Sequence, residues 1–218
     1  MSTSKDAYYK NVDLNSHADD FQRIVRTIFE DSAQFDVIAF SLGGRIALKT
    51  IASKPALIRR AHITGVSAER EAMAKIILKS WHDLLSQEED GSLKAFAWSI
   101  ILSTYSDSFL AMNGEKRISS WVDHICSNQR RLGLLRLLEQ TGNLEPMELV
   151  DPILRSNTKV QLAVGENDKI SACNQVEKLH TSLNLDDNVL IYEGCGHAVL
   201  NEHPAQWRKD ALAFLNDR

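Results

Sequence analysis

The stretch "IAFSLGG", residues 38–44, places one serine between a run of apolar residues and a pair of glycines. The run "FDVIAF" at 35–40 is suited to a short strand that is buried on both faces. The stretch after the serine, "GGRIALKTIASKP", predicts a helix that must end before Pro55. Ser41 therefore stands at a turn from a strand into a helix, where its side chain either fills the turn or is held out for chemistry.

Ser41 has small neighbours, since Ala39 and Gly43 stand two positions before and two positions after it. A strained strand-to-helix turn needs such neighbours so that the serine can project without a clash. A serine hydroxyl is a poor nucleophile until an imidazole accepts its proton, and the imidazole needs a carboxylate to fix its tautomer. A catalytic role for Ser41 thus requires a histidine and an acid at the same place in the fold.

The rest of the chain alternates between strand and helix patterns. Strand patterns occur at 59–66, 158–164 and 188–194, and helix patterns at 17–31, at 172–183 and from 203 onward. Between them, residues from about 68 to 157 are helical throughout. Strands that alternate with helices predict a parallel sheet. We expect a single α/β domain over residues 1–218, with a helical insertion at about 68–157.

The predicted helix 17–31 carries an apolar stripe with the spacing of one helix face. The stripe consists of Phe21, Ile24, Val25, Ile28 and Phe29. Ser16 and Asp19 stand three residues apart at its start and predict a capping box.

Two further polar residues fall at the ends of predicted strands, where ligands gather in a parallel sheet. Asp168 follows "VQLAVG", and His197 follows "NVLIYEGCG". Each has a plainer interpretation, since Asp168 can cap the next helix and His197 can be an ordinary loop histidine. Gly194 and Gly196 favour the catalytic interpretation of His197, because they free the backbone to turn its side chain inward.

Three motifs of the chain resemble those of the α/β-hydrolase superfamily. "AFSLGG", "VGENDKI" and "GCGHAVLNEHP" look like its nucleophile elbow, acid loop and histidine loop, in the same chain order. The resemblance implies that Ser41 is the nucleophile, Asp168 the acid and His197 the base, and that the backbone N–H of Leu42 supplies one oxyanion donor. It runs from about residue 12 to the C-terminus and implies that the helical insertion is a cap.

The chain departs from the superfamily's pattern in two ways. Ala39 replaces the first glycine of G-x-S-x-G. Several strands and a helix normally precede the helix at 17–31, so we expect a fold shortened at the N-terminus. The strand at 35–40 then becomes a sheet edge, which the segment 6–14 or a second copy in a homodimer would cover. The missing part would also carry the second oxyanion donor, whose loss typically costs about 10²–10³ in rate.

Several tryptophan and arginine side chains are weaker candidates for a functional role. Three tryptophans lie in the insertion, namely Trp81, Trp98 and Trp121. They either line an acyl pocket or, as we favour, pack the insertion together. Arg130 and Arg131 can clamp an acidic substrate, but a solvated helix face explains them more simply.

Composition narrows the class of protein. The net charge of −4 and the scattered Lys and Arg residues argue against a nucleic-acid partner. The apolar stretches are too short for a membrane span, and the N-terminus lacks the pattern of a secretory signal. Three cysteines without a CxxC pair suit reduced thiols in the cytoplasm, and the histidines show no metal-ligand spacing. We expect a cytoplasmic protein that needs no cofactor or metal.

These features predict a serine hydrolase that cleaves a small ester or thioester through an acyl-enzyme. Two alternatives stay open. The chain can be a truncated or non-catalytic protein of this fold that binds a ligand or a partner. It can also be an acyltransferase or a carbon–carbon bond hydrolase, in which only the acceptor or the scissile bond changes.

Overall fold

The computed structural model describes residues 12–29, 34–87 and 93–217. Its centre is a parallel sheet of four strands in the order β1-β2-β3-β4. The strands are β1 (Phe35–Phe40), β2 (Ile58–Thr64), β3 (Lys159–Gly165) and β4 (Leu190–Tyr192). Because all strands run in the same direction, their carboxyl ends meet at one edge, as the alternating pattern predicted.

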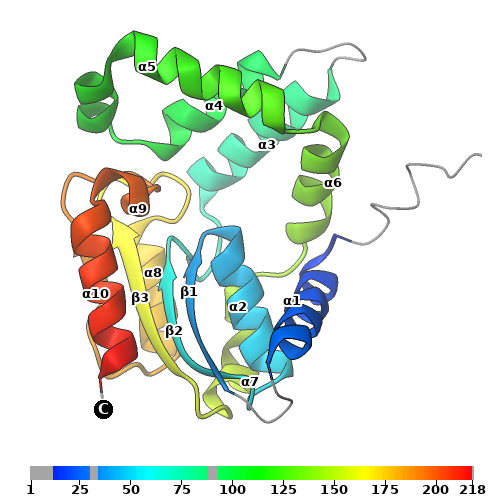
Figure 1. Ribbon diagram of the computed structural model, residues 1–218, viewed down its shortest axis with the longest axis vertical. Coiled ribbons are helices and arrows are strands. Elements are labelled where there is room, and N and C mark those ends of the chain that lie inside the picture. The colour runs from blue at the N-terminus through cyan, green and yellow to red at the C-terminus, as the bar shows by residue number, and fades with distance from the viewer. Residues whose placement is uncertain (1–11, 30–33, 88–92, 218) are drawn as a thin grey trace, which may run out of the picture.

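Helices surround this sheet and extend above it (Figure 1). They are α1 (Leu14–Ile28), α2 (Leu42–Ser53), α3 (Ala72–Ser86), α4 (Lys94–Thr104), α5 (Asp107–Asn128), α6 (Arg131–Thr141), α7 (Val150–Leu154), α8 (Cys173–Ser182), α9 (Val199–Glu202) and α10 (Pro204–Asn216). A 3-10 turn, η1 (Pro146–Leu149), precedes α7. Helices α3 to α6, which we call the cap, lie beyond the carboxyl ends of the strands (Figure 1).

Strand β2 shows how the sheet is covered on both faces. Ala61 and Ile63 point into a core shared with α2, α7 and α8. The alternate residues of β2 point to the other face of the sheet, against α10. Arg60 Nη1 donates to Phe214 O at 2.6 Å, and Trp207 Nε1 donates to Thr64 Oγ1 at 2.8 Å. Apolar packing on one face of β2 and buried, hydrogen-bonded polar side chains on the other thus fix the strand within the sheet.

Helix α1 begins earlier than the sequence pattern indicated, and the predicted capping box is wrong. Asp13 is the N-cap, and its side chain accepts a hydrogen bond from Ser16 N at 2.7 Å. This bond also holds the pKa of the Asp13 carboxyl below its usual value. Ser16 therefore lies inside the first turn, because the aspartate three residues earlier caps the free N–H groups instead.

Strand β1 is an edge of the sheet within the described residues, where it pairs with β2 alone. The prediction of burial on both faces is wrong for Ile38, which is 41% exposed. The apolar stripe of α1 is likewise only partly covered, since Val25 is buried but Ile28 is 67% exposed. Most of the segment 6–14, which we expected to cover this edge, lies outside the described residues.

A helix that crosses a bilayer must be both long and apolar, and the helices of the described ranges differ from this. None of them combines the length and the apolar character that crossing a membrane requires.

Candidate functional site

Ser41 occupies a strained turn between β1 and α2. Its backbone has φ 50° and ψ −118°, and residues other than glycine rarely adopt a positive φ. The turn is tied to the neighbouring strand, because Ser41 N donates to Thr64 O at 2.9 Å. Strain of this kind persists only where the surroundings enforce it, and it is common at functional sites.

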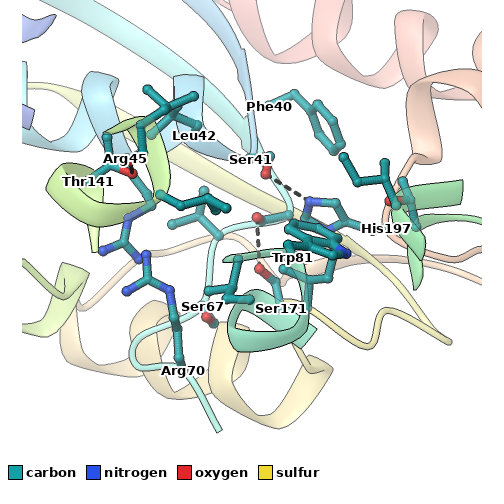
Figure 2. A pocket seen from close by; sticks show the side chains of 18 of the residues that line it. Phe40, Ser41, Leu42, Arg45, Ser67, Arg70, Trp81, Thr141, Ser171 and His197 are labelled. Atoms are coloured by element: carbon teal, nitrogen blue, oxygen red, sulfur yellow. Dashed lines mark hydrogen bonds between the residues drawn. The ribbon is translucent and has the colours of Figure 1, made fainter. Parts of the chain in front are cut away.

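The structure brings Ser41, His197 and Asp168 into one chain of hydrogen bonds. His197 Nε2 lies 2.8 Å from Ser41 Oγ, and His197 Nδ1 lies 2.7 Å from Asp168 Oδ2 (Figure 2 shows the first of these contacts). An ionised carboxylate accepts the Nδ1–H, which leaves Nε2 free to accept the serine proton. Because the three residues follow three different strands, the parallel sheet itself brings them together.

Asp168 is held in place on both sides of its carboxylate. While Oδ2 faces the imidazole, Oδ1 accepts hydrogen bonds from Ile170 N and Ser171 N, each at 2.8 Å. The side chain is fully buried. The simpler interpretation, in which Asp168 caps the next helix, is wrong, because the N-cap of α8 is Ala172 and Asp168 binds the turn before it.

The glycines of the turn have different roles from those the motif suggested. A methyl group on Gly43 would meet no atom within 4 Å among the described residues, so the space for Ser41 does not depend on it. A methyl group on Gly44 would come within 2.5 Å of Val66 Cγ2 and 2.7 Å of Ile63 Cγ2. The close approach of α2 to β2 therefore requires Gly44, not Gly43.

The loop that carries His197 docks on the corner between α4 and α5. His197 N donates to Thr104 O at 2.7 Å. Glu202 Oε1 accepts from both Ser106 N and Gly196 N at 3.1 Å, and its Oε2 accepts from Ser106 Oγ. The cap thus helps to position the histidine. Sequence analysis missed this corner, since nothing local in "STYSD" indicates a contact some ninety residues away.

A cavity of about 360 Å³ opens beside Ser41 and His197 (Figure 2). Its apolar wall comes largely from the cap and includes Leu78, Trp81, Phe96, Ile100, Leu134 and Leu138. Leu42 also lines the cavity. The backbone N–H of Leu42 is in the first turn of α2, where an N–H has no partner within the helix. A largely apolar pocket thus lies beside the serine, with the N–H of Leu42 available as a donor.

The tryptophans and arginines that the sequence offered as candidate site residues lie in different parts of the structure. Trp81 lines the cavity, whereas Trp98 and Trp121 pack inside the cap. Arg130 is exposed, and Arg131 Nη1 donates to Leu85 O at 2.6 Å. Neither arginine lines the cavity.

Two arginines that sequence analysis did not single out do line this cavity, namely Arg45 and Arg70. Helical spacing could have indicated Arg45, since it stands four residues after Ser41, in the first turn of the helix that Ser41 precedes. Arg70 follows β2 in a loop, and no pattern in the sequence points to it.

Solved structures identify the fold. An α/β-hydrolase enzyme from a Medee basin deep-sea metagenome library matches with a TM-score of 0.77 at 21% identity, over 90% of this chain and 71% of that chain. The enol-lactonase from Burkholderia xenovorans LB400 matches with a TM-score of 0.78 at 13% identity, over 94% and 74%. An esterase from Exiguobacterium antarcticum gives 0.75 at 14% identity, over 94% and 75%. The chain therefore has the parallel α/β-hydrolase fold that its motifs predicted.

The match by sequence covers less of the chain than the matches to solved structures do. No family model matches the chain. The pyrrolizixenacetamide deacetylase of Xenorhabdus hominickii is 25% identical over 115 residues, which are 52% of this chain and 42% of the deacetylase. The match thus spans less than half of that relative's length.

Proposed function

We propose that the protein is a serine hydrolase that cleaves a small ester or thioester. The observation that carries the proposal is the continuous contact from Asp168 through His197 to Ser41 at the mouth of an apolar cavity. The similarity to a deacetylase and to an esterase supports an acyl substrate.

The geometry suits a reaction in two halves. Ser41 Oγ attacks the acyl carbonyl while His197 Nε2 accepts the hydroxyl proton, and Asp168 stabilises the imidazolium that forms. The N–H of Leu42 donates to the oxyanion. His197 then gives its proton to the departing alkoxide or thiolate, which leaves an acyl group on Ser41. Water, deprotonated by the same imidazole, releases the acid and restores the serine.

The test is steady-state hydrolysis of p-nitrophenyl acetate, p-nitrophenyl butyrate, butyryl-coenzyme A and an N-acetyl amide. Wild type is expected to turn over at least one ester or thioester, and Ser41→Ala is expected to lose about 10³-fold or more in kcat/KM. Ser67→Ala is the matched control, because Ser67 lines the same cavity without contacting an imidazole in the described structure. Equal rates for wild type and Ser41→Ala would overturn the proposal.

A folded wild type that hydrolyses none of these compounds would favour the non-catalytic alternative. Acyl transfer would be recognised by adding an alcohol or an amine, which would then compete with water for the acyl group.

A further inference from the structure

The lining of the cavity beside Ser41 is mostly apolar but carries positive charge on one side. Of the described residues that line it, most are apolar and none is an aspartate or a glutamate. Its permanently charged side chains are Arg45 and Arg70, which Figure 2 shows on the side away from His197. Two cations with no anion on the cavity wall are an unusual lining for an apolar pocket, because a buried charge is costly unless it is paired.

Glu145, which lies outside the cavity lining, balances only part of this charge. Its Oε2 accepts from Arg45 Nη1 at 3.1 Å, and its Oε1 accepts from Arg70 Nη1 at 2.9 Å. One carboxylate thus serves two guanidinium groups. The Arg45 and Arg70 side chains are only 10% and 15% exposed, so water screens the remaining positive charge poorly.

Each of the two arginines has N–H donors from which no described residue accepts a hydrogen bond. Arg45 donates to Glu145 and to Leu144 O, while its buried Nε has no partner in the described structure. Arg70 donates from Nη1 to Glu145 and to Gly142 O, and its Nε and Nη2 make no hydrogen bond with described residues. The Nε–Nη2 edge is the edge that binds a carboxylate with two parallel hydrogen bonds.

The charge of Arg45 is only partly offset by its neighbours. Burial and the nearby charge of Arg70 lower its pKa to about 10, and the carboxylates of Glu145 and Glu148 offset only part of that change. Arg45 therefore keeps its charge at neutral pH, and a further anion beside it would stabilise the charged form.

We propose that Arg45 and Arg70 form an anion subsite, and that the substrate carries a carboxylate on a short aliphatic chain. This inference rests on the proposed function, because it concerns the substrate of the same site. Ser41, Arg45 and Arg70 line the same cavity of about 360 Å³, so the aliphatic chain between the carboxylate and the scissile carbonyl is short. The methylene groups lie against the apolar wall, and the carboxylate accepts the free donors of Arg70.

Binding to Ser41→Ala tests the subsite without requiring turnover. Monomethyl adipate and dimethyl adipate have the same chain and differ in one negative charge, and calorimetry gives the dissociation constant of each. A second pair, 4-acetoxybutanoate and its methyl ester, places the carboxylate in the alcohol part instead of the acyl part. We expect the anion of at least one pair to bind about 10–100-fold more tightly than its neutral ester.

Substitutions at Arg70 assign the effect to this subsite. Arg70→Gln in the Ser41→Ala background is expected to abolish the preference for the anion, and Arg70→Lys to retain part of it. The matched control is Arg208→Gln, which removes one exposed positive charge far along the chain on α10. Equal binding of anion and neutral ester in both pairs would overturn the subsite, as would a preference that survives Arg70→Gln. Absence of hydrolysis in wild type would count against the proposed function alone.

Discussion

Gly65 makes room for the imidazole of His197. It follows β2 with φ 69°, a conformation that glycine adopts without strain. A methyl group there would lie 2.9 Å from His197 Cε1 and 3.2 Å from its Nδ1. Any other residue would therefore strain the backbone and push the ring away from Ser41 and Asp168.

Gly65→Ala is expected to lower kcat about 10²-fold, because small displacements of a catalytic group have effects of this size. The free energy of unfolding should fall by about 1–3 kcal/mol from the strained φ. Ester hydrolysis and urea unfolding measure the two effects.

Gly43→Ala is the control for this pair, since the added methyl group would meet nothing within 4 Å among the described residues. It should leave kcat unchanged and leave stability equal or up to about 1 kcal/mol higher. A Gly65→Ala variant as active as Gly43→Ala would contradict the role given to Gly65.

Among the elements, the histidine loop depends on the corner between α4 and α5. Glu202→Ala removes the acceptor shared by Ser106 and Gly196, so the loop should lose its attachment to the cap. We expect a loss of about 1–3 kcal/mol in the free energy of unfolding and at least about a tenfold drop in kcat. Thermal unfolding and ester hydrolysis are the measurements.

Glu193→Ala provides the comparison on the same loop, because Glu193 is exposed and makes no hydrogen bond or ion pair with described residues. If both variants behave alike, the attachment through Glu202 does not position His197.

Local patterns predicted most of these elements. Apolar runs between turn residues indicated the strands, and the order of Ser41, Asp168 and His197 indicated where they meet. The start of α1 was missed because Asp13 and Ser16 are both ordinary N-cap residue types, and only the tertiary position of the helix decides between them. The pairing of Arg70 with Glu145 was out of reach for a similar reason, since it joins a loop to a residue 75 positions away.

At the scale of the whole molecule, the main feature is the unpaired edge of the sheet at β1. Strand β1 leaves one side unpaired within the described residues, and Ile24, Ile28 and Phe29 of the neighbouring α1 segment are exposed. An unpaired strand edge beside exposed apolar side chains is a template for pairing with another strand. We therefore propose that the chain self-associates through β1, which would cover the edge with a second copy.

Ile38→Lys should shift this self-association toward the monomer, because a charge on an edge strand opposes pairing. Sedimentation velocity over a range of protein concentrations reports the change. Met112→Lys, on the exposed surface of the cap, should leave it unaffected. A wild type that stays monomeric, or an equal response to both substitutions, would contradict the proposal.

The activated serine is the central claim of this account, and labelling with a fluorophosphonate probe tests it most directly. The probe reacts with a serine whose proton an imidazole accepts, whatever the natural substrate is. We predict that wild type and Ser67→Ala become labelled, that peptide mass spectrometry places the adduct on Ser41, and that Ser41→Ala stays unlabelled. A folded wild type that does not react, or a label that persists in Ser41→Ala, would contradict the assignment of Ser41 as the nucleophile.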